Sequence, residues 1–205
     1  ARQIFAGIEG YAGYGFCEAH AAAFAVTAYR TAYLARHYPA HYFAALLSNQ
    51  PMGYYAPHTL VTVARNRGVA VLPPDINKSS AHFTVENGAI RAGLARVRNL
   101  SRRTLAAILR AREEGDFTDL ADFCRRVPAT AEETVNLILG GAFDSLHPNR
   151  RAVLWAFRSG RKGGVGQPSP SAPVDAPPLL PCGDGIPDFS PAEKNYLEWQ
   201  VLGLT

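Results

Sequence analysis

Apolar and small residues recur every three or four positions over residues 18 to 37, and this spacing predicts an amphipathic helix. Pro39 breaks the pattern, and the stretch HYFAALLSN after it resumes the same period. Pro57 is suited to the first position of a further helix, PHTLVTVARNR, which Gly68 would end. We therefore expect the first third of the chain to be helical.

The pattern then shifts to an alternation typical of strands. VAVLPPD reads as a short strand that runs into a proline turn. HFTVENGAIRAG alternates apolar and polar residues around Asn87-Gly88, a dipeptide suited to a type I′ turn. The predicted fold class is therefore mainly α with a small β-hairpin.

Helical spacing returns in the second half of the chain. A helix is expected at 101 to 114, stopped by Gly115, and shorter ones near 118 to 126, 131 to 139 and 149 to 158. Residues 160 to 187 are rich in Gly, Pro and Ser, which predicts a flexible linker with little core of its own. Ser190 and Glu193 then form a capping-box pattern that opens a last helix, closed by Gly203.

The segment GLARVRNLSRRTLAAILRAREEG, residues 93 to 115, is the most basic helix entry in the chain. Residues 93 to 98 can form a short helix, 99 and 100 a tight turn, and 101 onward a second helix. The first N–H groups of a helix have no internal partner and carry the positive end of its dipole, which suits a phosphate. This geometry is that of a helix-hairpin-helix, which binds the DNA backbone irrespective of sequence. The candidate contacts are Arg98, Asn99, Ser101, Arg102 and Arg103.

A second copy of the pattern begins about forty residues later, in AEETVNLILGGAFDSLHPNRRAVLWAF. Here a helix leads to a glycine pair, and Asn149 with two arginines opens the next helix. Two such units are expected to pack as a pseudo-twofold four-helix domain that grips both strands of a duplex. The alternative is a plain helical bundle with surface arginines. The second set of candidates is Gly140, Gly141, Asn149, Arg150 and Arg151.

Charge is distributed unevenly along the chain. The net charge is +4, yet residues 91 to 162 hold fourteen Lys/Arg against eight Asp/Glu, a balance of +6. The rest holds seven against nine, a balance of −2. An excess confined to one segment favours a polyanionic partner, although a solvated basic surface would show the same counts.

Composition excludes several classes of protein. No stretch of eighteen apolar residues runs without polar interruption, so we expect no transmembrane helix, no membrane partner and no signal peptide. Cys17, Cys124 and Cys182 are odd in number and lack zinc spacing, which favours reduced thiols in the cytoplasm. No residue is assigned to catalysis or to a metal. Because the chain begins Ala-Arg-Gln, it reads as a fragment of a larger protein.

Five blocks of sequence resemble consecutive blocks of bacterial C-family DNA polymerases, the family of the DNA polymerase III alpha subunit. They are AGYGFCEAHAAAFA at 12 to 25, HYPAHYFAALLSNQPMG at 37 to 53, VLPPDINKS at 71 to 79, GAFDSL at 141 to 146 and VLGLT at 201 to 205. The blocks follow the family's order over nearly the whole chain. Glu18 and the phrase SNQPMGYYAPHTLV are more similar to the error-prone branch than to the main replicative enzyme.

The resemblance implies a division of the chain. Residues 1–80 would be a distal fingers segment, and 81–159 the β-hairpin with the tandem helix-hairpin-helix domain. Residues 160–187 would be the linker, and 188–205 a helix that leads to a further domain.

The resemblance also implies an activity for the parent protein that we do not expect of this chain alone. The parent would be a DNA-directed DNA polymerase acting on template-primer duplex, with Mg²⁺ held by palm carboxylates upstream of residue 1. We therefore expect no bound cofactor and no polymerase activity from this piece alone. A sliding clamp or other replication and repair proteins would bind through regions outside it. The alternative is a non-catalytic DNA-binding or scaffold module of a repair complex.

Two positions bear on the ranking of the candidate contacts. Many family members carry glycine where this chain has Ser101, and glycine lets a backbone approach phosphate closely. The first hairpin is thus expected to contact DNA more weakly than the second, which has Gly140 and Gly141. His20 is a candidate fingers contact near nucleotide or template, with local bonding to neighbouring backbone as the favoured alternative.

Overall fold

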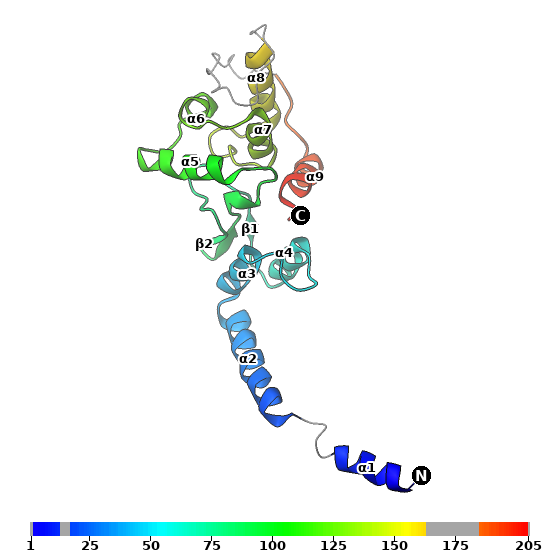
Figure 1. Ribbon diagram of the computed structural model, residues 1–205. Helices are drawn as coiled ribbons and strands as arrows, with labels where there is room; N and C mark the ends of the chain where they lie inside the picture. Colours follow the sequence, from blue (N-terminus) through cyan, green and yellow to red (C-terminus); the bar gives the residue numbers. More distant parts are fainter. Residues whose placement is uncertain (1, 13–16, 163–184, 205) are drawn as a thin grey trace.

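The computed structural model describes residues 2–12, 17–162 and 185–204. Four helices make up the first third: α1 (Arg2–Ala12), α2 (Glu18–His37), α3 (Pro39–Ser48) and α4 (Pro57–Asn66). The last three confirm the predicted helices, and Pro39 and Pro57 each occupy a first helical position. Helix α1 was not predicted. Helix α2 projects away from the rest as an arm, with α1 beyond it (Figure 1).

A three-stranded sheet lies between α3 and α4 on one side and the second half of the chain on the other (Figure 1). Strands β2 (Thr84–Glu86) and β3 (Ala89–Arg91) form the predicted hairpin. Its turn residues Asn87 and Gly88 have φ of 52° and 80°, as a type I′ turn requires. Strand β1 (Val71–Leu72) pairs with β3 in parallel and gives the order β1-β3-β2. The strand itself was predicted, but its pairing with the hairpin was not.

The remaining elements surround the candidate hairpins. They are the 3-10 turn η1 (Leu94–Arg96) and helices α5 (Arg102–Glu113), α6 (Leu120–Arg126), α7 (Ala131–Leu139), α8 (Arg150–Lys162) and α9 (Pro191–Leu202). The predicted capping box of Ser190 and Glu193 opens α9, and Gly203 ends it in the left-handed region. Helix α8 runs three residues into the stretch that we predicted to be a linker. Residues 163–184 of that stretch lie outside the described residues.

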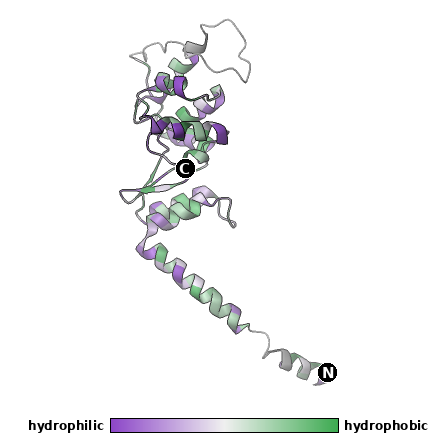
Figure 2. Ribbon diagram, turned by 60° about the vertical axis from the view of Figure 1, so that its left-hand side comes forward, coloured by the Kyte–Doolittle hydropathy of each residue, from purple (hydrophilic) through white to green (hydrophobic). Residues whose placement is uncertain are grey.

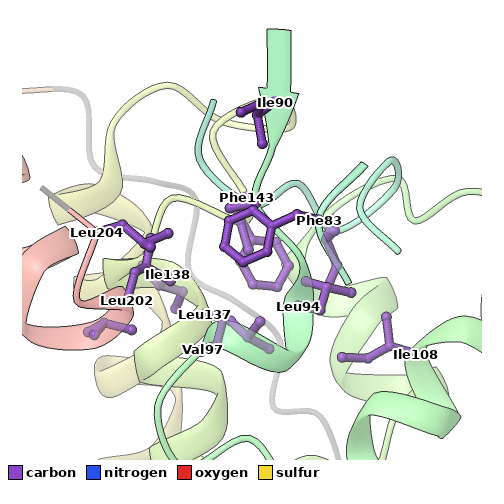
Figure 3. Packing of buried hydrophobic residues seen from close by; sticks show 14 of the residues in the cluster. Phe83, Ile90, Leu94, Val97, Ile108, Leu137, Ile138, Phe143, Leu202 and Leu204 are labelled. Atoms are coloured by element: carbon purple, nitrogen blue, oxygen red, sulfur yellow. The ribbon is translucent and has the colours of Figure 1, made fainter. Parts of the chain in front are cut away.

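One hydrophobic cluster extends from α3 to the residues after α9. Figure 3 shows Phe83 and Ile90 from the sheet region converging with Leu137, Ile138 and Phe143 from the second hairpin. The cluster therefore spans the predicted limit between residues 80 and 81. It fixes the second hairpin against the sheet, and Ile76 N donates to Ala142 O across 2.8 Å at the same junction.

The arm contributes little to this core. None of the residues of α2 is buried, although the ribbon of Figure 2 is coloured hydrophobic along much of this helix. Within the described ranges, no helix is both long and apolar enough to traverse a lipid bilayer.

Candidate nucleic-acid interface

The first hairpin is a tight turn between η1 and α5. Asn99 takes the left-handed conformation, with φ of 58°, which a short polar side chain tolerates. Ser101 is extended and caps α5, because its hydroxyl accepts a hydrogen bond from the backbone N–H of Thr104 at 3.1 Å. The sequence-predicted turn and helix start are thus both present.

Three arginines of this hairpin face solvent. Arg98, Arg102 and Arg103 are exposed, and none of the ion pairs in the described ranges involves them. Among the described residues, no acceptor meets the backbone N–H groups of Arg102 and Arg103 either. The hairpin therefore presents three unpaired guanidinium groups beside two unpaired amides at a helix N-terminus, which suits a phosphate.

A carboxylate from the second unit already occupies part of this helix N-terminus. Glu133 is 4% exposed, and its Oε1 accepts the Ser101 N–H at 2.9 Å. Its Oε2 accepts the Thr130 N–H at 2.7 Å, so one side chain caps α7 and contacts the start of α5. Burial alone would raise the Glu133 pKa, but hydrogen bonds from Thr130 and Ser101 outweigh it and hold the pKa below its usual value.

Helix α7 also forms hydrogen bonds with Asn99 and with the backbone of Arg98. Asn99 Nδ2 donates to Glu132 Oε1 at 2.6 Å, while Asn136 Nδ2 donates to Arg98 O at 2.8 Å. The side chain of Asn99 and the amide of Ser101 are therefore committed to α7. Any phosphate at this hairpin would be met by the arginine side chains and by the next two amides.

The second hairpin is closed by protein. Gly140 is buried, and a side chain there would meet Val201 and Leu202 of α9. Gly141 has φ of +85°, and a Cβ would collide with the guanidinium of Arg150. The N–H groups of both glycines donate to carbonyls of α7. These glycines serve close packing within the protein and expose no amide to DNA.

Arg150 is an internal ion-pair partner. It is 4% exposed, and its guanidinium donates to Asp144 at 2.6 Å and to Glu198 at 2.7 Å. Its third partner is Leu139 O, which accepts from Nη1 at 3.2 Å. Burial would lower the Arg150 pKa, but the hydrogen bonds and charges of Asp144, and then those of Glu198, hold the pKa above its usual value. All three guanidinium nitrogens therefore already donate to acceptors within the protein. A contact of Arg150 with phosphate stays a prediction, and it would have to displace these bonds.

The start of α8 is covered as well. The Asn149 side chain accepts the Ala152 N–H at 2.9 Å and donates to Ile186 O at 2.7 Å. The Arg151 guanidinium lies 4.5 Å from the centre of the Phe189 ring and 3.3 Å from a carboxylate oxygen of Glu193. With 34% of its side chain exposed, Arg151 can reach DNA only by giving up these contacts.

Helix α9 contacts both hairpins through hydrogen bonds and an ion pair. Val201 O accepts the Arg98 N–H at 3.0 Å, and Leu202 O accepts Arg96 Nε at 2.6 Å. Glu198 on the same helix reaches Arg150. Helix α9 thus covers the second hairpin and leaves the arginine side chains of the first hairpin exposed. Which hairpin contacts DNA more strongly stays a prediction.

His20 lies elsewhere. It is on the first turn of α2 in the arm, exposed, with its ring edge-on to Phe24 at 4.5 Å between centroids. Within the described ranges the His20 side chain makes no hydrogen bond. The alternative favoured from the sequence, a hydrogen bond to neighbouring backbone groups, is therefore not seen there. A contact of His20 with nucleotide or template stays a prediction.

Three acidic residues shape this interface and were missed by sequence reasoning. The pattern Thr-Ala-Glu-Glu at 130 to 133 is a capping-box signature that could have identified Glu133 as a cap. The hydrogen bond that Glu133 accepts from the Ser101 N–H depends on tertiary packing, so no pattern of neighbouring residues predicts it. Asp144 precedes Arg150 by six residues, and Glu198 follows it by forty-eight, so neither spacing identifies a partner.

Among the described residues, no group of three or more His, Cys, Asp or Glu side chains could hold a metal ion. Within the described ranges, Cys17 is an exposed free thiol. The Mg²⁺ implied for the parent polymerase concerns residues outside this chain and stays a prediction.

Comparison with known proteins identifies the motif and its relatives. A family model described as a helix-hairpin-helix motif matches residues 68–153, which include both hairpins. The chain is 45% identical to an error-prone DNA polymerase of Symbiobacterium thermophilum, over 98% of this chain and 22% of the relative. It is 38% identical to one of Anaeromyxobacter dehalogenans, over 100% of this chain and 19% of the relative.

A third relative, the error-prone DNA polymerase of Bdellovibrio bacteriovorus, is 41% identical over 78% of this chain and 16% of its own length. The resemblance to this polymerase family, including its error-prone branch, is thus confirmed. The chain spans about a fifth of the length of the relatives that it matches.

Proposed function

We propose that this chain is the duplex-binding segment of an error-prone DNA polymerase. Its first hairpin would hold the backbone of template-primer DNA through Arg98, Arg102 and Arg103. The observation that carries the proposal is the similarity to an error-prone polymerase over 98% of the chain, combined with three exposed arginines at one helix start that form no ion pair with the described residues. In physical terms the contact is electrostatic, so it would not depend on base sequence.

Under this proposal, nucleotide transfer is carried out by other parts of the protein. Nucleotide transfer would require the palm carboxylates and Mg²⁺, so purified chain should incorporate no nucleotide. Sliding-clamp contacts would also belong to other regions. We place the activity in the cytoplasm, where thiols such as Cys17 stay reduced.

Salt-dependent binding tests the assignment of the first hairpin. The R102A/R103A variant should weaken binding of a fluorescein-labelled duplex, as measured by anisotropy, equally for unrelated sequences. Each phosphate contact contributes roughly 0.9 to the slope of log affinity against log salt, so the slope should flatten by up to about two units. Folding should be unaffected, because both side chains are exposed.

The matched control is R110A/R158A, which removes two exposed arginines away from the hairpin turn. Both double variants lower the net charge by two, so any difference in duplex affinity between them reflects where the arginines lie and not how much charge was removed. Equal losses in the two double variants would make the hairpin an ordinary basic surface. No loss in R102A/R103A would remove it from the DNA contact altogether.

A further inference from the structure

Aromatic rings form a ladder on one face of the arm. Tyr29, Tyr33 and His37 lie one helical turn apart along α2. The ring centroids of Tyr29 and Tyr33 are 6.4 Å apart, and those of Tyr33 and His37 are 4.3 Å apart. Tyr29 is 72% exposed and Tyr33 47%, so the ladder of Tyr29, Tyr33 and His37 faces solvent.

Two arginines flank this ladder. Each residue of a helix turns by about 100°, so Arg30, just after Tyr29, and Arg36, just before His37, fall on opposite sides of the row of rings. Both are exposed, and none of the ion pairs in the described ranges uses either of them. The rings can therefore stack on the bases of a bound nucleic acid, while an arginine that has no ion-pair partner among the described residues neutralises its phosphates on each side.

The surrounding sequence has no negative charge. Between Glu18 and Asp75 the chain carries four arginines and no Asp or Glu. A polyanion along the arm would therefore meet attraction without local repulsion. A stripe of small residues on α2 lies on a different face, about a third of a turn from the ladder, so a helix packed on the stripe would leave the rings accessible. The stripe consists of Ala21, Ala25, Ala28, Ala32 and Ala35.

We propose that the ladder of Tyr29, Tyr33 and His37, with Arg30 and Arg36, binds single-stranded DNA. Stacking requires a base whose face is free, which unpaired nucleotides offer and an intact duplex does not. The two guanidinium groups would meet the phosphates between stacked bases. This site uses none of the hairpin residues that we assign to duplex binding, so the two proposals can fail separately.

The test is binding of the whole chain to a fluorescein-labelled oligothymidylate of about 15 nucleotides. Y29A/Y33A should weaken binding about tenfold or more, and Y29F/Y33F should restore it, since stacking uses the ring and not the hydroxyl. R30A/R36A should flatten the salt slope by up to about 1.4 units, roughly 0.7 for each single-strand phosphate contact. Binding of blunt duplex should be unchanged in all three variants.

Y54A/Y55A is the matched control, because it removes two exposed tyrosines from the loop between α3 and α4. A loss in this control equal to that in Y29A/Y33A would overturn the proposal. So would unchanged oligothymidylate binding in Y29A/Y33A. If Y29A/Y33A instead abolishes self-association in light scattering, with no effect on oligothymidylate, the ladder is a protein-packing surface and the proposal is wrong.

Discussion

Replacing Arg150 by alanine separates a structural role from a DNA contact. The substitution removes the positive charge that Asp144 and Glu198 share and leaves the carbonyl of Leu139 without its donor. Breaking a buried ion pair by removing one partner costs about 3–5 kcal/mol. The Asp144 and Glu198 side chains are 32% and 18% exposed, so water can rehydrate them, and we expect about 3 kcal/mol.

Arg151 provides the comparison. Its ion pair joins side chains that are 34% and 53% exposed, and such pairs contribute up to about 1 kcal/mol. Its position over the Phe189 ring adds roughly 0.5–1 kcal/mol. R151A should therefore lower the free energy of unfolding by about 1 kcal/mol, well below the effect of R150A.

Urea unfolding followed by circular dichroism measures both losses. With a urea slope of about 2–3 kcal/mol per molar, R150A should lower the unfolding midpoint by roughly 1–1.5 M. Under conditions where the variant is still folded, its duplex affinity should match that of the unchanged chain. An unchanged midpoint together with weakened duplex binding would refute the ion-pair account and restore Arg150 as a phosphate contact.

Three further outcomes follow from the packing. G141A should destabilise the chain by about 2 kcal/mol or more, because its positive φ and its contact with Arg150 both oppose a side chain, and thermal unfolding measures this. F123A should cost about 3–5 kcal/mol by urea unfolding, since the Phe123 ring is fully buried. The Glu133 pKa is lowered in the folded state, so its contribution to stability is present above the unfolded-state pKa of about 4.3 and lost as pH falls toward the folded value. Stability measured from pH 6 to pH 3 should therefore depend less on pH in E133Q, and an identical pH profile would contradict the carboxylate's role at Ser101.

Much of the local structure was readable from the sequence because it depends on neighbouring residues. Pro39, Pro57 and the Ser190 capping box fixed three helix starts, and Asn87-Gly88 fixed the hairpin turn. Each of these signals acts within a few residues, through fixed φ angles or side-chain caps.

The candidate interface could be predicted only in part, because exposure is set by distant segments. The arginine pairs at 102–103 and 150–151 look alike in the sequence, and both open a helix. Only the second pair meets α9, which returns after a long intervening stretch and brings Glu193 and Glu198 against it. The parallel pairing of β1 with β3 was missed for the same reason, since no local pattern records it.

The central claim is that DNA phosphates meet the start of α5 and not the second hairpin. Heteronuclear NMR of ¹⁵N-labelled chain, titrated with a short duplex, observes both sites in one experiment. The account predicts that the amide signals of Arg102 and Arg103 shift as duplex is added, while those of Gly140 and Gly141 stay in place. Shifts at Gly140 and Gly141 with unmoved signals at Arg102 and Arg103 would contradict it.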